Sequence, residues 1–259
     1  IPATFFSVAR VAELYGNSIK NLRKKGHEIG CHGLSHDETD EYNTLSYAKA
    51  HKRLARATDI ISSVSEEPVT SFRGPRVKTS ADTQQALEEL GYTADGSVCS
   101  QRLDFLSSNR IHTGWIMAPR RPYHPHITNP FKKGKRSLLV VPLSALMIPF
   151  LSGTLYTFGL AATKLMFKIL YLESRLSGKP IVYLLHPGEF VPKTLSREKE
   201  YESSVEGFPV RRSKAIYEQD RTRRLAQHRE LFSYMNRFSG VEFITMRDYV
   251  DYYTRRREI

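Results

Sequence analysis

The chain has 259 residues, 40% of them hydrophobic and 11% aromatic, which suits a folded globular protein and excludes a disordered one. Two cysteines, Cys31 and Cys99, are too few for a disulfide framework, so we expect reduced thiols. The net charge of +12 favours anionic partners, but the basic residues are scattered and accompany no nucleic-acid-binding motif. We therefore predict no specific nucleic-acid binding, and keep peripheral contact with an anionic surface as a candidate.

The first hundred residues alternate between strand-like and helix-like segments. We predict strands at 3–8, 27–31, 69–73 and 92–98. We predict helices at 9–25, at 43–63 with Asn43 or Thr44 as its cap, and at 80–90 between a Ser80 cap and Gly91. Such alternation predicts parallel strands in an α/β layered or barrel fold, with active residues at the carboxyl ends of the strands.

The rest of the chain is less regular. Four prolines argue against a regular element within 99–136, a length of irregular chain that is typical of a binding loop. Residues 137–163 carry no charge and could span a membrane by length, but Pro142, Pro149 and Gly153 interrupt them. The remaining predicted elements are a strand at 138–142, an amphipathic helix at 158–176, a strand at 181–185, a charged helix at 212–237, a strand at 241–244 and a helix at 246–254. With no linker or repeat, we predict a single domain over 1–259.

The stretch GHEIGCHGLSH at 26–36 places two histidines, His32 and His36, four residues apart after a short strand. Two imidazoles at this spacing can bind one metal ion if the backbone between them makes a helical turn. Gly33 permits a tight backbone, and Ser35 offers a supporting hydroxyl. The pair alone is a weak signal, because two histidines at this spacing often bind no metal.

Four stretches follow one another along the chain: GHEIGCHGLSH (26–36), SFRGPR (71–76), YTADGSV (92–98) and YLLHPGEF (183–190). In this order they resemble the motifs of the polysaccharide deacetylase, or NodB-homology, family, in its branch with an HPWEF-like last motif. An ATFF strand before them and FITMRDY near the end resemble the same family. The resemblance spans nearly the whole chain and implies a distorted (β/α) barrel that hydrolyses C–N bonds with a divalent metal.

The resemblance also implies roles for single residues. His32 and His36 would bind the metal, usually Zn²⁺, and His186 would be the general acid. Arg73 would orient the active carboxylate, and Asp95 would be a supporting acid. Leu184 would form a wall of the acetyl pocket, and a backbone N–H near Arg76 would donate to the oxyanion. Independently of the resemblance, the run that begins at Tyr123 is either a substrate wall or a rigid surface loop.

One family motif has no counterpart here. In the family, a strand ending in an Asp pair supplies the catalytic base and the third metal ligand, and it precedes the ATFF strand. We therefore expect an N-terminally truncated sequence whose first strand is missing from the barrel, with unpaired backbone beside 3–8 and 181–185. Asp37, Glu38 and Asp40 lie near the histidines as weaker replacements for the missing carboxylate. No signal peptide is visible, and we expect a cytoplasmic location.

Three functions fit these observations. The first is metal-dependent removal of N-acetyl groups from an amino sugar in a polysaccharide or its precursor. The second is hydrolysis of a ureide or cyclic imide by the same fold, which a pocket closed by residues 120–126 would favour over an open glycan groove. The third is a non-catalytic glycan- or anion-binding module, which the missing aspartates keep open. No sequence feature predicts an oligomeric state.

Overall fold

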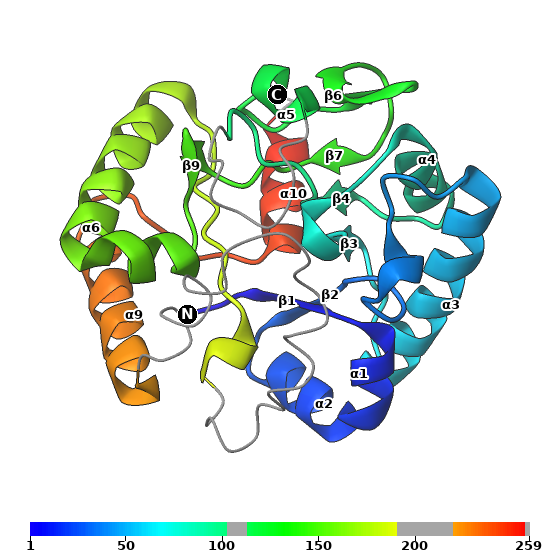
Figure 1. Ribbon diagram of the computed structural model, residues 1–259, viewed down its shortest axis with the longest axis horizontal. Coiled ribbons are helices and arrows are strands. Elements are labelled where there is room, and N and C mark those ends of the chain that lie inside the picture. Colours follow the sequence, from blue (N-terminus) through cyan, green and yellow to red (C-terminus); the bar gives the residue numbers. More distant parts are fainter. Residues whose placement is uncertain (103–112, 191–219, 257–259) are drawn as a thin grey trace. The chain divides into compact units, whose positions relative to one another are not determined.

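The computed structural model describes residues 1–102, 113–190 and 220–256 (Figure 1). The fold divides into two compact units, each built from separated stretches of chain. The first comprises Ile1–Ser100, Thr113–Pro142 and Phe243–Ile259, and the second comprises Gln101–His112 and Leu143–Glu242. The single catalytic domain over 1–259 therefore stays a prediction.

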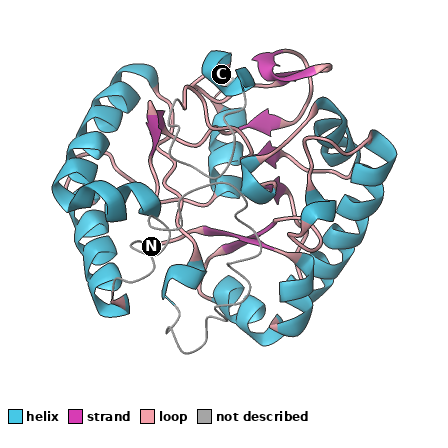
Figure 2. Ribbon diagram, viewed as in Figure 1, coloured by secondary structure: helices cyan, strands magenta, loops and turns pink. Residues whose placement is uncertain are grey.

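A parallel five-stranded sheet lies at the centre of the first unit (Figure 2). Its strands, in spatial order, are β1 (Thr4–Ser7), β2 (Glu28–Cys31), β3 (Ser71–Phe72), β4 (Ala94–Asp95) and β7 (Leu139–Val140). The predicted parallel α/β arrangement is confirmed, although the strands are shorter than predicted. The sheet does not close into a barrel in the described part of the chain, where β1 pairs with β2 and with no other strand.

Helices connect the strands of the first unit, as parallel pairing requires. They are α1 (Ala9–Leu14), α2 (Gly16–Lys24), α3 (Tyr47–Ser65) and α4 (Ala81–Glu89), and the unit also contains the C-terminal helix α10 (Met246–Arg255). The single helix predicted at 9–25 is wrong, because the chain leaves helical geometry at Tyr15. The start predicted for α3 is also wrong, since neither Asn43 nor Thr44 caps it and the Tyr47 N–H donates to Asp82. The Ser80 cap of α4 is confirmed by the bond it accepts from the Thr83 N–H.

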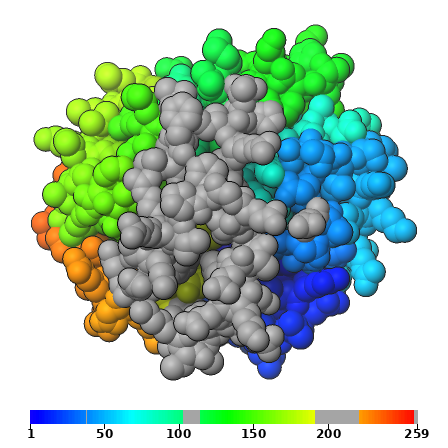
Figure 3. Space-filling view, in the orientation of Figure 1, coloured from blue at the N-terminus to red at the C-terminus, as the bar shows by residue number. Residues whose placement is uncertain are grey.

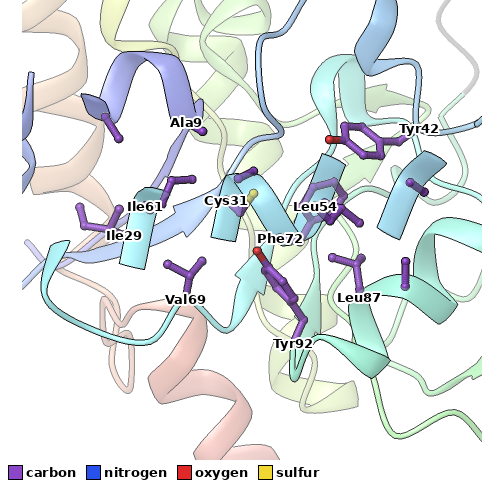
Figure 4. Close-up of a cluster of buried hydrophobic side chains, with 14 of the residues drawn as sticks. Ala9, Ile29, Cys31, Tyr42, Leu54, Ile61, Val69, Phe72, Leu87 and Tyr92 are labelled. Atoms are coloured by element: carbon purple, nitrogen blue, oxygen red, sulfur yellow. The ribbon is translucent and has the colours of Figure 1, made fainter. Parts of the chain in front are cut away.

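The core of the first unit lies between α3, α4 and the sheet (Figure 4). Leu54 and Ile61 of α3 are fully buried, and so is Phe72 of β3. Cys31 is free and buried among them, and burial raises the pKa of its thiol to about 11. Cys99 is also buried, and neither cysteine takes part in a disulfide among the described residues.

The C-terminal helix α10 completes the first unit beside its N-terminal strand. The Met246 N–H donates to the Thr4 hydroxyl at 2.8 Å, and the Arg247 N–H donates to the Glu28 carboxylate at 3.0 Å. The Arg247 guanidinium pairs with Glu67 after α3 at 3.2 Å. The two ends of the sequence therefore meet within one unit.

The segment 99–136 contains regular structure, against the prediction. Its elements are α5 (Thr113–Met117) and the antiparallel pair β5 (Pro125–His126) and β6 (Asn129–Lys133). Prolines are tolerated in strands at a sheet edge, and a two-stranded sheet has only edges. Residues 103–112 of this segment lie outside the described part of the chain.

The second unit is mainly helical. Its elements are β8 (Ala145–Leu146), β9 (Ile148–Pro149), α6 (Ser152–Ser177), the single-turn helix η3 (Pro187–Phe190) and α9 (Arg221–Met235). Helix α6 starts earlier than predicted and is interrupted at Gly159, whose φ of +79° suits glycine. Residues 181–185 do not form the predicted strand, and only an isolated bridge joins Leu184 to Leu151. Residues 241–244, which the structure describes, do not form the predicted strand either. Helix α9 covers the later part of the charged helix predicted at 212–237. Residues 212–219 of that prediction lie outside the described part of the chain.

Candidate active site

The two predicted metal ligands lie directly after β2. The His32 N–H donates to the Ser7 carbonyl at 2.8 Å, which continues the parallel pairing of β1 and β2. The helical turn that was the condition for both imidazoles to reach one metal ion does not form, because Gly33 has a φ of +83° and His36 a φ of +59°. A β-carbon at Gly33 would lie 2.8 Å from the Asp40 carboxylate, so only glycine fits there. The two imidazole rings nevertheless lie close, with centroids 5.1 Å apart.

Asp40 holds the loop that carries the histidines. Its buried carboxylate accepts the Ser35 N–H at 2.6 Å and the His36 N–H at 2.9 Å. Its second oxygen accepts the Nε of Arg53 in α3 at 2.7 Å. Burial works to raise the pKa of Asp40, but these donors outweigh it and hold the pKa below its ordinary value. Asp40 is therefore a loop anchor, which corrects its assignment as a candidate third metal ligand.

Asp37 is also occupied locally. It caps the single-turn helix η1 (Glu38–Asp40) by accepting the Thr39 N–H at 2.9 Å. This bond satisfies an N–H that the short helix leaves without a main-chain partner. Asp37 thus acts as a cap, in place of the metal-binding role considered for it.

Strand β3 fixes the orientation of His32. The Arg73 N–H donates to the Cys31 carbonyl at 3.0 Å, and the Arg73 carbonyl lies 2.5 Å from the His32 Nδ1. Because a carbonyl can only accept, Nδ1 carries the proton and Nε2 keeps its lone pair. Metal-binding histidines commonly donate their other ring N–H to such a carbonyl, so His32 fits a metal ligand. Within the described residues, no group of three or more histidine, cysteine and acidic side chains could hold a metal ion.

The side chain of Arg73 is buried at the carboxyl end of the sheet. Its guanidinium lies 4.6 Å from the centroid of the Phe6 ring, and its Nε donates to the Gly96 carbonyl at 3.2 Å. Burial lowers the pKa of Arg73 to about 10, although the charge of Asp95 works in the opposite direction. No ion pair joins Arg73 to a carboxylate among the described residues, so its role as an orienting partner stays a prediction.

Asp95 lies at the end of β4, fully buried. It accepts hydrogen bonds from the Thr79 hydroxyl at 3.0 Å, the Gln84 amide at 3.0 Å and the Ser97 N–H at 2.8 Å. Burial raises the pKa of Asp95 despite these donors. These hydrogen bonds tie Asp95 to Thr79, Gln84 and Ser97, and Asp95 acts on Arg73 through its charge. A direct catalytic role for Asp95 stays a prediction.

The predicted substrate contacts in the first unit have different environments. Arg76 lies in the single-turn helix η2 (Pro75–Val77) with a φ of +57°, and its side chain pairs with Glu41. Gly74 begins this turn, where a β-carbon would lie 2.0 Å from the Lys78 carbonyl oxygen. Tyr123 is only 2% exposed, and its hydroxyl donates to the Pro130 carbonyl at 2.6 Å. This enclosed position fits the rigid-loop alternative for Tyr123 better than a substrate wall.

The predicted acid lies in the second unit beside a carboxylate that the sequence reasoning did not single out. His186 is exposed, and its Nδ1 lies 3.2 Å from the carboxylate of Glu189 in η3. Glu189 is buried and also accepts the Ser152 hydroxyl at 2.6 Å and the Tyr156 hydroxyl at 3.0 Å. Burial works to raise the pKa of Glu189, but these donors hold it below its ordinary value. The signal was the acidic residue three positions after the histidine in HPGEF.

Leu184 lies two residues before this pair and is buried. Its carbonyl accepts the Ser152 N–H at 2.9 Å, which links it to the start of α6. Leu184 and His186 thus share one framework with Glu189 in the second unit. His32, His36 and Arg73 share another in the first.

Replacing His32 with alanine is expected to lower the affinity of the protein for Zn²⁺ at least about tenfold, because an oriented imidazole ligand is lost. Isothermal titration with Zn²⁺ measures the affinity. His51→Ala in α3 is the matched control, since it removes a histidine away from the loop. Equal Zn²⁺ affinities for the wild-type protein and His32→Ala would contradict the assignment of His32.

Comparison with known proteins finds a sequence match over the first third of the chain. Residues 1–94 match the family model of polysaccharide deacetylases. The peptidoglycan deacetylase of Helicobacter pylori is 26% identical over 98 residues, which are 38% of this chain and 32% of that protein. The chain thus matches about a third of the length of that curated relative.

Solved structures share the fold over nearly the whole chain. A Mycobacterium smegmatis protein assigned to the polysaccharide deacetylases superposes with a TM-score of 0.63 at 17% identity, covering 99% of this chain and 73% of that one. A Pseudomonas aeruginosa protein with the same assignment gives 0.62 at 17% identity, covering 98% and 68%. PuuE allantoinase gives 0.61 at 19% identity, also covering 98% and 68%. Residues 1–94 therefore resemble the polysaccharide deacetylases in sequence, and the chain shares the fold of these solved structures.

Proposed function

We propose that this protein is a metal-dependent hydrolase that removes the acetyl group from an amino-sugar nitrogen in a polysaccharide or its precursor. The observation that carries the proposal is the family match over residues 1–94, which contain the paired histidine rings and the carbonyl that orients one of them. The similarity to a peptidoglycan deacetylase supports a carbohydrate substrate.

The metal would be held by His32 and His36, and we propose Zn²⁺. When bound, Zn²⁺ polarises a carbonyl oxygen and lowers the pKa of a water molecule toward about 7. His32 would present Nε2, because Nδ1 donates its proton to the Arg73 carbonyl. His36 is exposed, and the Asp40 carboxylate fixes its backbone position.

His186 would give a proton to the leaving nitrogen. An amine leaves poorly unless it is protonated as the C–N bond breaks, and histidine is the usual donor near neutral pH. Glu189 holds Nδ1, which leaves Nε2 to carry the transferred proton. The Ser152 and Tyr156 hydroxyls in turn hold Glu189, so the imidazole is oriented before substrate binds.

The proposal is tested by assaying the natural protein for acetate release from N-acetylchitooligosaccharides. We expect the wild-type protein to release acetate. A chelator should abolish this activity, added Zn²⁺ should restore it, and the His32→Ala variant should release acetate more slowly. Parallel assays with allantoin and a cyclic imide test the alternative activity of the same fold. Higher kcat/KM on either of these compounds would replace the proposal, and glycan binding with no hydrolysis in the presence of Zn²⁺ would indicate a binding module.

Replacing Glu189 with glutamine is expected to lower kcat by about tenfold or more, with KM little changed. This loss of kcat is smaller than the loss of about 10²–10⁴-fold expected when the general acid itself is removed. The amide keeps the size of the carboxylate but loses the charge that stabilises a protonated imidazole. The measurement is kcat against pH for the wild type and the variant. Glu242→Gln, at an acidic residue outside the described helices, is the control. A pH profile identical to that of the wild type would show that Glu189 only supports the fold.

A further inference from the structure

Helix α6 carries a row of exposed apolar side chains on its outer face. These side chains, all after the break at Gly159, and their exposed fractions are Leu165 60%, Ile169 46%, Leu172 54% and Leu176 88%. We call them the apolar stripe. Their spacing of three or four residues puts them on one side of the continuous helix that follows Gly159. A contiguous exposed apolar surface is uncommon on a soluble monomer and commonly marks a site of interaction.

The opposite face of α6 is committed to the second unit. Phe167 and Leu170 are buried there, and the Phe167 ring packs against Tyr234 of α9 and against Phe238. Helix α6 is long and apolar enough to cross a membrane by length and composition, but a third of its most apolar window is buried inside the protein. Spanning a bilayer would uncover that face and break its packing. The geometry therefore suits a helix that lies flat on an apolar layer.

Basic side chains accompany the stripe. Lys168 and Arg175, seven residues apart and both exposed, flank it on one side. Helices α6 and α9 pack together (Figure 1). Their sequences carry seven lysine and arginine residues, of which Arg224 is buried, against two acidic ones. Both acidic residues are already paired: Glu230 lies 2.7 Å from Lys164, and Glu173 lies 2.7 Å from Lys179. The surface around the stripe is therefore positive.

We propose that the apolar stripe docks on an anionic lipid membrane, with α6 in the plane of the interface. The stripe would enter the boundary between headgroups and acyl chains, and Lys168 and Arg175 would lie at the lipid phosphates. In Figure 3 the yellow-green atoms of α6 lie at the surface of the drawn face. A second copy of the chain fits less well, because a symmetric contact would bring the two positive flanks close to each other.

Vesicle sedimentation tests the proposal with the whole chain. Vesicles of phosphatidylcholine alone are compared with vesicles that contain 40% phosphatidylglycerol, a fraction of about the anionic content that attracts basic segments. Two variants probe the surface: Leu165→Gln with Ile169→Gln and Leu172→Gln, and Lys168→Gln with Arg175→Gln. The control is Leu14→Gln with Met117→Gln, which changes side chains that are 76% and 82% exposed in the first unit.

We expect binding to the phosphatidylglycerol vesicles that weakens with salt and is poor on phosphatidylcholine. Each basic residue contributes about 1 kcal/mol near such a surface, so losing two should weaken binding about 30-fold. The triple glutamine variant should lose binding more severely, and the control should keep it. Thermal unfolding followed by circular dichroism confirms that each variant is folded.

Three outcomes would overturn the proposal. One is no binding of the wild type to either kind of vesicle. Another is binding by the folded triple variant equal to that of the control. The last is a stable dimer in sedimentation velocity that the triple variant dissociates, which would assign the stripe to a second copy of the chain.

Discussion

Replacing His186 with alanine is expected to lower the turnover of amide hydrolysis about 10²–10⁴-fold, while Zn²⁺ stays bound. The imidazole is exposed and tied to a buried carboxylate, so it has both access to a substrate and a fixed orientation. In the proposed mechanism its loss removes the proton donor for the leaving nitrogen but leaves the histidine loop of the first unit unchanged. Initial rates of acetate release measure the loss, and titration with Zn²⁺ checks that the metal site is intact.

A matched control separates loss of the acid from loss of any surface histidine. His126 is exposed and its ring contacts the hydroxyl of Thr128, two residues away. His126→Ala should keep the wild-type rate. If His186→Ala also kept the wild-type rate, His186 would have no part in the mechanism. A second test changes the substrate. An ester with a good leaving group needs less protonation than an amide, so His186→Ala should lower its turnover of the ester less than its turnover of the amide.

Replacing Asp40 with alanine is expected to lower the free energy of unfolding by about 3 kcal/mol at pH 7. The change leaves two N–H groups of the histidine loop and the Arg53 guanidinium without their acceptor. Urea unfolding followed by circular dichroism measures the loss. Asp59→Ala is the control, because Asp59 is an exposed acid on α3, the same helix as Arg53. A loss no larger than that of the control would show that Asp40 does not hold the loop.

The contribution of Asp40 also depends on pH in a defined direction. Its pKa in the folded protein lies below its ordinary value, so the unfolded chain takes up the proton more readily. The stabilisation is therefore complete above the ordinary pKa of an aspartate, about 4, and is lost as pH falls through the folded pKa. The difference in unfolding free energy between the wild type and Asp40→Asn should shrink toward acid pH. A difference that grew below pH 4 would contradict this sign.

The parallel strands and the Ser80 cap of α4 could be predicted from the sequence because their signals are local. Alternating apolar segments and a serine before a helix depend little on the rest of the fold. The prolines of 125–130 misled the prediction, because they indicate irregular chain in a central strand but not at the edge of a two-stranded sheet. The helix predicted at 9–25 is wrong for a similar reason, because the spacing of its apolar residues does not reveal the break at Tyr15.

The site could be predicted only in part for a related reason. The motifs single out His32, His36 and His186, whose roles stay predictions, but they do not show how each imidazole is oriented. The turn between His32 and His36 depends on Asp40, whose role rests on a contact with α3. The link from His186 to Glu189 is local in sequence, yet its strength comes from hydroxyls on α6 that precede it by more than thirty residues. Such contacts follow from tertiary packing, which a motif does not record.

The position of α10 has a consequence for how the chain is made. The first unit takes its last helix from residues that follow the whole second unit, and that helix bonds to Thr4 and Glu28. During synthesis the early strands emerge first, but their final neighbour leaves the ribosome only at Met246–Arg255. Expression of residues 1–142 alone should therefore give an incomplete, aggregation-prone product, and adding a synthetic peptide of 243–256 in trans should partly restore its stability.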